Sequence, residues 1–255
     1  MTAQGYTVIA LAGVPLVRPG DDLCRIVTDA AVASALTLAD GDIVVLAQKI
    51  VSKAEDRQIA LASIEPSPEA IALAQTTLKD ARLVELILRE TDEVMRARPN
   101  VLIVRHRLGL VLANAGIDQS NTGAAEGVQA LLLPVDPDAS AARLRQGIRV
   151  ATGATVAVLI IDSLGRAWRM GTAGTAIGVA GLAPVLDLRG RPDLNGRRLE
   201  SSELGLADEI AAAASLAMGQ ADEGTPVVVI RGLRHDVAEG GARDIVRPAA
   251  MDLFR

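Results

Sequence analysis

Cysteine and aromatic residues are almost absent from this chain of 255 residues. Cys24 is the only cysteine, and Tyr6, Trp168 and Phe254 are the only aromatic side chains. A lone cysteine cannot form an intrachain disulfide, which is typical of a protein of the reducing cytoplasm. So few aromatic residues exclude the stacking platforms on which proteins bind single-stranded nucleic acids.

Long apolar runs and an excess of basic charge are also missing. Half of the residues are hydrophobic, yet no run approaches the roughly 18 apolar residues of a membrane-spanning helix. The first residues, "MTAQGYTVIALAGVPLV", lack the basic start of a signal peptide. The net charge is −5 with both signs spread along the chain, whereas a sequence-independent nucleic-acid binder needs a basic face. We expect a cytoplasmic protein that binds neither membranes nor nucleic acids.

Lysine is rare, and its placement is informative. It occurs only at positions 49, 53 and 79, and arginine supplies the rest of the 26 basic residues. The spacing of four puts Lys49 and Lys53 on one face of either a helix or a strand. Two interpretations stay open. In the first, the pair protects a solvated strand edge. In the second, it contacts a phosphate, at which the compact ammonium of lysine is not interchangeable with the planar guanidinium of arginine.

Apolar periodicity predicts both strands and helices. β-branched runs bounded by Gly, Asp or Pro predict mostly buried strands at residues 41–52, 101–104, 155–162 and 226–232. A helix is expected to begin at the N-cap Ser67 and to continue or restart through residues 80–97. A second helix is expected from about Leu206 to Gly219. Residues 165–200 show no long element, and the order is too irregular for a doubly wound sheet. We therefore expect an α+β fold of mixed sheets and packed helices.

Several common catalytic motifs are absent. No Walker A phosphate-binding loop and no Rossmann glycine pattern occurs in the sequence. Ile161 stands where the nucleophile elbow of a hydrolase requires glycine. The two histidines and one cysteine cannot form a typical zinc site.

Three polar segments remain as candidates for a site. Asp118 lies in "NAGIDQSNT", whose residues are typical either of a turn or of a ligand-binding loop. Asp162 ends a predicted strand and is either a cap or a hard-oxygen metal ligand beside a glycine-rich loop. The segment "MGQADEGTP" follows the second helix and is typical of a solvated loop. Tight turns explain most of the glycines, and we expect Trp168 to pack rather than to stack on a cofactor. Together, the acids, amides and lysines suggest a metal-dependent nucleotide site.

Several blocks follow one another in an order typical of a known family. They are "AGVPLV", "KIVSKAEDR", "LVELILRET", "ANAGIDQSN", "DSLGRAWRMGTAGTAIGVAG", "DLRGRPDLNGRRL", "ADEIAAAASLAMGQADEGTPVVVIRG" and "DIVRPAAMDLFR". They span nearly the whole chain and resemble the coenzyme F420-0:L-glutamate ligases, which add γ-linked glutamates to a deazaflavin coenzyme. The resemblance implies one ligase unit over residues 1–255, without the nitroreductase-like domain that follows it in some bacteria.

The resemblance also implies the partners and the fold. The family uses GTP, two divalent cations (Mg²⁺ or Mn²⁺) and K⁺, and forms an intertwined homodimer of a two-lobed α+β fold. The implied substrates are GTP, L-glutamate and coenzyme F420-0, joined through an acyl phosphate. The open alternatives are an amide ligase of the same scaffold with another carboxylate acceptor, and a non-catalytic module that binds GTP or metal.

The resemblance assigns site residues as follows. The nucleotide contacts would be Gly13, Val14, Pro15, Leu16, Gln48, Lys49, Lys53, Asn121, Met218, Gly219, Gln220, Ala221, Asp222, Glu223, Gly224 and Thr225. The family often has small hydroxyl residues at the positions of Gln48 and Lys49. The first metal would be held by Asp118 and Asp162, and the second by Ser163 and Gln220. No general base is implied.

Overall fold

The computed structural model describes residues 5–119 and 128–252, and within them the protein is a mixed α/β structure with four sheets and six α-helices. The strands are β1 (Thr7–Ala10), β2 (Ile43–Ala47), β3 (Gln58–Ala60), β4 (Thr91–Arg98), β5 (Val101–His106), β6 (Val111–Ala113), β7 (Gln129–Leu131), β8 (Ala157–Arg166), β9 (Arg169–Ala180), β10 (Leu186–Asp187), β11 (Glu203–Leu204) and β12 (Val227–Arg231). The helices are α1 (Leu23–Ala33), α2 (Gln48–Ala54), α3 (Pro68–Thr77), α4 (Ala81–Arg89), α5 (Pro137–Thr152) and α6 (Leu206–Met218). Short 3₁₀ turns are η1 (Leu61–Ser63), η2 (Asn114–Gly116), η3 (Ala242–Ile245) and η4 (Ala249–Met251). The expected mixture of sheets and packed helices is confirmed.

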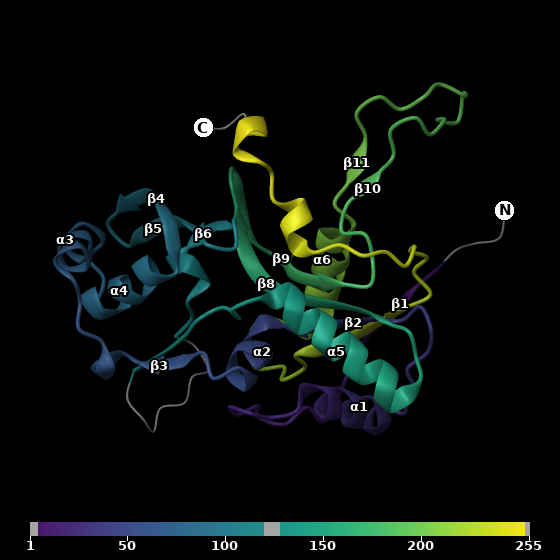
Figure 1. The fold of residues 1–255 in the computed structure, drawn as a ribbon, viewed down its shortest axis with the longest axis horizontal. Coiled ribbons are helices and arrows are strands. Elements are labelled where there is room, and N and C mark those ends of the chain that lie inside the picture. Colours follow the sequence, from purple (N-terminus) through teal and green to yellow (C-terminus); the bar gives the residue numbers. More distant parts are fainter. Residues whose placement is uncertain (1–4, 120–127, 253–255) are drawn as a thin grey trace.

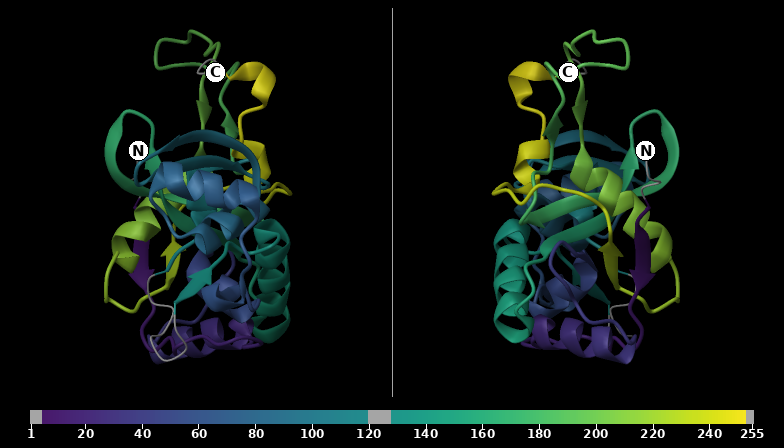
Figure 2. Two further views of the ribbon diagram at one scale, coloured as in Figure 1. Left: turned by 90° about the vertical axis from the view of Figure 1, so that its left-hand side faces the viewer. Right: turned by 90° about the vertical axis from the view of Figure 1, so that its right-hand side faces the viewer.

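A five-stranded sheet of order β1-β12-β2-β8-β9 forms the larger part of the molecule (Figure 1). Val44 and Leu46 of β2 face a core shared with α1 and α5, while Ile43 and Val45 face a core shared with α6. Figure 2 shows α5 and α6 on opposite flanks of this sheet. Because both faces are covered, the central strands are continuous apolar runs, which is why the sequence identifies them.

Strand direction brings several chain segments to one edge of this sheet. β2 pairs parallel with β8, and β12 pairs antiparallel with both β1 and β2. β1, β2 and β8 therefore run in the same direction, with Ala47 beside Ile161. The amide of Ala47 donates to the carbonyl of Pro226, just before β12. The residues after β1, after β2 and before β12 consequently meet at the level of Asp162.

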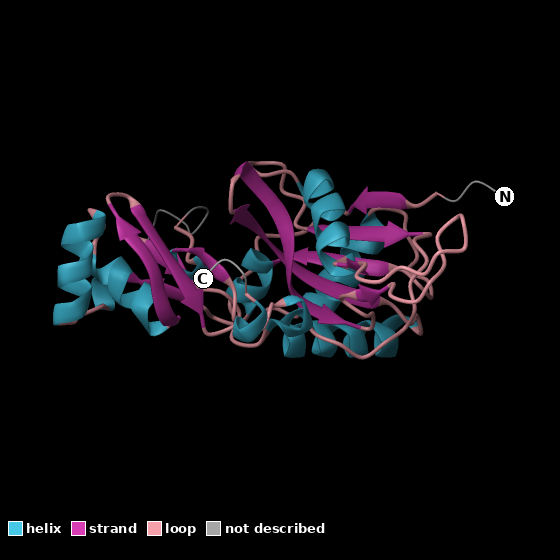
Figure 3. Ribbon diagram, turned by 90° about the horizontal axis from the view of Figure 1, so that it is seen from above, coloured by secondary structure: helices cyan, strands magenta, loops and turns pink. Residues whose placement is uncertain are grey.

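A second part of the molecule holds the three-stranded sheet β4-β5-β6 with α3 and α4 packed on it. Figure 3 shows it at the opposite end from the β1-β12-β2-β8-β9 sheet. It has its own buried cluster, which includes Leu61, Leu86, Leu102 and Leu132. Ser67 caps α3 as expected, its hydroxyl accepting from the amide of Ala70 at 3.2 Å.

Two predicted elements end earlier than expected. The run 41–52 is a strand only to Ala47, after which α2 begins. The helix predicted through residue 97 ends at Arg89, and Thr91–Arg98 forms β4 instead. β4 pairs along β5, so cross-strand contacts outweigh the helical propensity of its charged residues. Within α4, Glu85 and Arg89 form an ion pair one helical turn apart, at 3.0 Å.

Besides β4 and several short strands, three long elements were not expected from the sequence. They are α1, α5 and the long strand β9, which lies in the stretch 165–200 that showed no long element. Gly174 and Gly178 of β9 explain the error. A Cβ on Gly174 would clash with the carbonyl of Ala211 in α6, and one on Gly178 with the carbonyl of Pro137 in α5. These glycines allow helices to approach the strand closely and are not turn residues.

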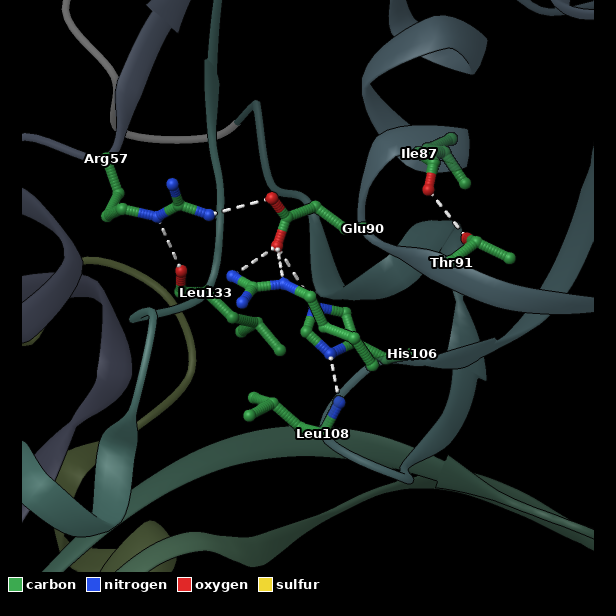
Figure 4. A network of polar contacts seen from close by, with 8 residues as sticks. Arg57, Ile87, Glu90, Thr91, His106, Leu108 and Leu133 are labelled. Atoms are coloured by element: carbon green, nitrogen blue, oxygen red, sulfur yellow. Dashed lines mark hydrogen bonds and ion pairs between the residues drawn. The ribbon is translucent and has the colours of Figure 1, made fainter.

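A buried carboxylate joins the β4-β5-β6 end of the molecule to the segment after α2 (Figure 4). Glu90, at the end of α4, accepts from Arg57 Nη2 at 2.9 Å and from Arg107 Nε at 2.9 Å. The ring of the fully buried His106 lies 3.4 Å from Glu90 Oε2 through Nε2. The amide of Leu108 donates to His106 Nδ1, so Nε2 carries the hydrogen that faces Glu90.

The charge of Glu90 is strongly favoured in the folded state. Burial alone would raise the pKa of Glu90, but hydrogen bonds from His106, Arg57 and Arg107 outweigh burial and lower it to about 2. A carboxylate whose pKa is lower in the folded than in the unfolded chain stabilises the fold above its unfolded pKa. That stabilisation is lost as the pH falls through the folded pKa.

No helix among residues 5–119 and 128–252 has the length and apolar character needed to cross a membrane.

We expect Glu90→Gln to destabilise the protein by about 3 kcal/mol at pH 7, because Arg57 and Arg107 lose a buried counter-ion. The difference from the wild type should shrink as the pH falls from 4.5, the ordinary value of a glutamate, to about 2. Urea unfolding followed by circular dichroism across this range measures it. The matched control is Glu93→Gln, whose side chain is 47% exposed and pairs with Arg105, and whose cost should stay below about 1 kcal/mol. If Glu90→Gln lowered the free energy of unfolding equally at pH 3 and pH 7, the lowered pKa of Glu90 would be contradicted.

Candidate active site

A cavity of about 520 Å³ lies at the sheet edge where these segments meet. It is enclosed by α2, the middle of β8 with the facing part of β9, and the end of α6 with the loop that follows it. Its lining comprises Ala47, Gln48, Lys49, Ile50, Lys53, Asp118, Ile161, Asp162, Ser163, Thr172, Ser215, Met218, Gly219, Gln220, Ala221, Glu223, Gly224, Thr225 and Pro226. Most of the site residues predicted from the sequence are therefore brought together.

The two lysines come from α2, which starts directly after β2. Lys49 and Lys53 are one helical turn apart, so both project into the cavity. The interpretation of this pair as protection of a strand edge is wrong, because the segment is a helix. Burial and the neighbouring Lys49 lower the pKa of Lys53, while Asp118 acts in the opposite direction.

Asp118 reaches the cavity from an extended segment. A left-handed turn at Asn114 and Ala115 precedes it, and its backbone exchanges hydrogen bonds with Leu131 at 3.0 and 2.8 Å. Its carboxylate lies 2.5 Å from Lys49 Nζ. The turn and the ligand-loop interpretations of this stretch thus apply to successive residues: the turn comes first and the carboxylate faces the cavity.

Asp162 is in the middle of a strand and caps neither a helix nor a turn. It pairs with Thr175 of β9, and its carboxylate accepts from the amide of Ser163 at 2.8 Å. Burial raises the pKa of Asp162, and the negative charge of Asp118 adds to this. The Ser163 amide and Lys49 oppose the shift. The two carboxylates therefore lie close enough to disfavour each other's charge, an arrangement that a bound cation relieves.

The loop after α6 completes the cavity. Gln220 Oε1 accepts from Ser163 Oγ at 2.8 Å, and its Nε2 donates to Ser215 Oγ at 3.0 Å. The backbone amides of Ala221, Glu223 and Gln220 lower the pKa of Glu223, so this loop turns N–H groups toward an anion. Residues 220–224 are exposed, as expected of a solvated loop, and all of them except Asp222 also line the cavity.

Some predicted residues lie elsewhere. Residues 13–16, proposed as nucleotide contacts, follow β1 at the same sheet edge but do not line the cavity, and neither does the exposed Asp222. Gln48 lines it with a side chain that is buried and bonded to Ser52 at 2.8 Å. Asn121 lies outside the described residues. Trp168, expected to pack, is 83% exposed at the β8–β9 turn, so that expectation is wrong for this chain taken alone.

Sequence reasoning missed two hydroxyl residues of the cavity. Thr172 lies in β9 opposite Gly165, and Ser215 lies in α6 next to Gln220. Ser215 is a polar residue within an otherwise alanine-rich helix, which was the available signal. The sequence offered no such signal for Thr172, because the strand that carries it was not predicted.

A larger cavity of about 680 Å³ lies between α5, the β5–β6 turn and η3. It contains none of the predicted site residues. Two of its three carboxylates serve the fold: Asp136 accepts from the amide of Ala139, and Asp138 from those of Val179 and Ala242. The smaller cavity is therefore the better candidate for an active site.

The donor set of the smaller cavity fits a hard divalent cation. Asp118, Asp162, Ser163 and Gln220 offer carboxylate, hydroxyl and amide oxygens, the ligand types that Mg²⁺ and Mn²⁺ prefer. Among the described residues there is no group of three or more His, Cys, Asp or Glu that could hold a metal by itself. Two carboxylates with uncharged oxygens suit Mg²⁺, which keeps several waters and shares its coordination with substrate phosphates.

Fold and cavity together define a mixed α/β protein with a cavity of lysines, carboxylates and a glycine-containing loop at one sheet edge. The family model described as F420-0:Gamma-glutamyl ligase matches residues 13–232, and the chain belongs to this family.

Relatives with this kind of name match nearly the whole chain. A protein of Methanothermobacter thermautotrophicus named coenzyme F420:L-glutamate ligase is 47% identical over 99% of this chain and 100% of its own length. A protein of Methanopyrus kandleri with the same name is 45% identical over 98% of this chain and 99% of its own. One of Methanocaldococcus jannaschii, also so named, is 44% identical over 86% of each chain.

Because the chain has only three lysines, amine acylation read by mass spectrometry can follow each one separately. We expect Lys53 to become reactive toward acetic anhydride at a lower pH in the folded protein than in urea, because burial and Lys49 lower its pKa. The unfolded chain is the control, since it offers the same lysine without its neighbours. Equal midpoints in the two states would rule out the electrostatic environment described for the cavity.

Proposed function

We propose that the protein is a GTP-dependent ligase that joins L-glutamate to coenzyme F420-0 through an amide bond and builds a γ-linked tail. The observation that carries the proposal is the convergence of Lys49, Lys53, Asp118 and Asp162 in one cavity. The printed names of relatives 45% and 47% identical over nearly the whole chain support the choice of coenzyme and amino acid.

The cavity provides for a triphosphate in three ways. Lys49 and Lys53 offer ammonium groups to phosphate oxygens. The loop Met218–Thr225 turns backbone amides toward the carboxylate of Glu223, whose place a phosphate would take. Asp118 and Asp162 would hold one divalent cation, Mg²⁺ or Mn²⁺, and Ser163 with Gln220 a second. A cation bound there supplies charge neutralisation at the transferred phosphoryl group. Residues 13–16 at the same edge and Asn121 remain proposed nucleotide contacts.

The proposed reaction has two steps. A carboxylate oxygen of the coenzyme attacks the γ-phosphorus of GTP, the bond to the bridging oxygen breaks, and GDP leaves with the electron pair. The amine of glutamate then attacks the acyl carbon, phosphate leaves, and the amine proton passes to water or substrate. The protein has to align the reactants and balance charge. A cavity with lysines and carboxylates meets this demand, and no Ser-His-Asp arrangement is found among the described residues.

The remaining expectations are proposed on the same basis. They are one ligase unit over residues 1–255, the two-lobed family fold, stimulation by K⁺ and an intertwined homodimer in the cytoplasm. The β8–β9 turn supports the homodimer, because Trp168 and Met170 are both strongly exposed there. Exposed apolar side chains grouped together are typical of protein–protein contacts.

The direct test is incubation of the purified protein with GTP, Mn²⁺, L-glutamate and coenzyme F420-0, followed by mass spectrometry of the coenzyme. We expect its mass to increase by whole glutamate residues, with GDP and phosphate released in equal amounts. Phosphate release only with a different carboxylate acceptor would contradict the proposed substrate. GTP binding without phosphate release under any acceptor would contradict catalysis.

Two isosteric variants locate the reaction in the same assay. Asp118→Asn and Asp162→Asn remove a charge without changing size and should each lower turnover at least about 100-fold, the scale typical of losing a group that stabilises the transition state. Asp29→Asn, on the exposed face of α1 beside Arg25, is the matched control and should keep normal turnover. Near-normal activity in either cavity variant would refute its assigned role.

A further inference from the structure

We infer that Arg57, held by the buried carboxylate of Glu90, is a positioning residue that fixes Asp118 relative to the lysines of α2. The inference rests on the proposed function in one respect, namely that Asp118 binds the metal. It is carried by a closed ring of contacts that starts and ends in the cavity.

The first half of the ring runs from Asp118 to Arg57. The backbone of Asp118 exchanges two hydrogen bonds with Leu131. The next residue, Leu132, donates its amide to the carbonyl of Arg57 at 3.1 Å. Leu133 accepts from Arg57 Nε at 2.9 Å. Arg57 therefore binds residues 132 and 133, directly after the residue that pairs with Asp118, with both its backbone and its side chain.

The second half of the ring runs from Arg57 back to Asp118 through α2. The amide of Arg57 donates to the carbonyl of Ser52 at 2.9 Å, within the helix that carries Lys49. Lys49 closes the ring on Asp118 at 2.5 Å. A displacement of residues 131–133 relative to α2 would therefore change the separation of the lysine and the carboxylate.

Glu90 sets the direction of the Arg57 side chain. The guanidinium presents two parallel N–H groups: Nε meets Leu133, and Nη2 meets Glu90 Oε1 at 2.9 Å (Figure 4). Only 18% of the Arg57 side chain and 9% of the Glu90 side chain is exposed. Water therefore competes little with this pair, and the two hydrogen bonds fix the orientation of the Arg57 guanidinium.

Arg107 provides a matched comparison. It also donates to Glu90, through Nε at 2.9 Å and Nη2 at 2.8 Å. Its backbone amide bonds to the carbonyl of Glu90, and it has no hydrogen bond to residues 131–133 among those the structure shows. Arg57 and Arg107 thus share the same anion, and of the two only Arg57 is seen to contact residues 131–133, with which Asp118 pairs.

The test compares Arg57→Lys with Arg107→Lys. Each substitution keeps the positive charge but replaces the rigid guanidinium group by a single ammonium on a flexible chain. Equilibrium Mn²⁺ binding, followed by electron paramagnetic resonance, should weaken at least about tenfold in Arg57→Lys, as is typical when a partner that orients a metal ligand is lost. Arg107→Lys should bind Mn²⁺ like the wild type. Equal weakening in both variants, or none in Arg57→Lys, would overturn the inference.

A second readout needs no metal. Hydrogen exchange of the Leu131 and Leu132 amides should accelerate in Arg57→Lys and stay unchanged in Arg107→Lys, because only the first variant loosens residues 131–133. Unchanged exchange in Arg57→Lys would overturn the inference. Failure of the wild type to bind Mn²⁺ would instead contradict the proposed metal site, and the exchange rates would then decide the positioning role. If Arg57→Lys does not fold, Glu90→Asp replaces it, since it keeps the charge and draws the carboxylate away from Arg57.

Discussion

The parallel pairing of β2 with β8 is the constraint on which the site depends. It places Ala47 beside Ile161, so that α2 starts next to Asp162. The antiparallel strand β12 then delivers the loop that follows α6 to the same edge. Because β2 and β8 are buried on both faces, their register is fixed by packing and cannot shift without exposing apolar side chains. The lysines, Asp162 and the loop thus hold their relative places through the sheet.

Asp118 differs from these residues because it does not belong to the β1-β12-β2-β8-β9 sheet. It arrives from the end of the molecule that carries β4, β5 and β6, on a segment tied to Leu131. Its ion pair with Lys49 connects this segment to α2. Arg57, which Glu90 holds, connects α2 to residues 131–133, with which Asp118 pairs. Two separate links between the same elements restrict rotation as well as translation. A site that needs both acids near one phosphate chain benefits from such restriction.

Much of the cavity could be predicted from the sequence, for reasons that are specific to each residue. Lys49 and Lys53 stood out because lysine is rare here, and the ends of strands β2, β8 and β12 were visible as apolar runs. β4 was mistaken for helix, since its charged residues form a strand only when β5 pairs with them. β9 was missed because its glycines are required by the close packing of α5 and α6 against the strand, and these helices are not adjacent to the glycines in sequence. Thr172 and the role of Arg57 depend on such tertiary contacts and leave no local pattern.

In the proposed site, Asp118 and Asp162 hold one divalent cation beside the phosphates of a bound guanine nucleotide. Crystals grown with Mn²⁺ and GDP, measured at a wavelength where manganese scatters anomalously, test it most directly. We expect an anomalous peak bonded to carboxylate oxygens of both residues, with phosphate oxygens completing the coordination and Lys53 within hydrogen-bonding distance of a phosphate. A manganese peak that touches neither carboxylate, with the nucleotide bound elsewhere, would contradict it.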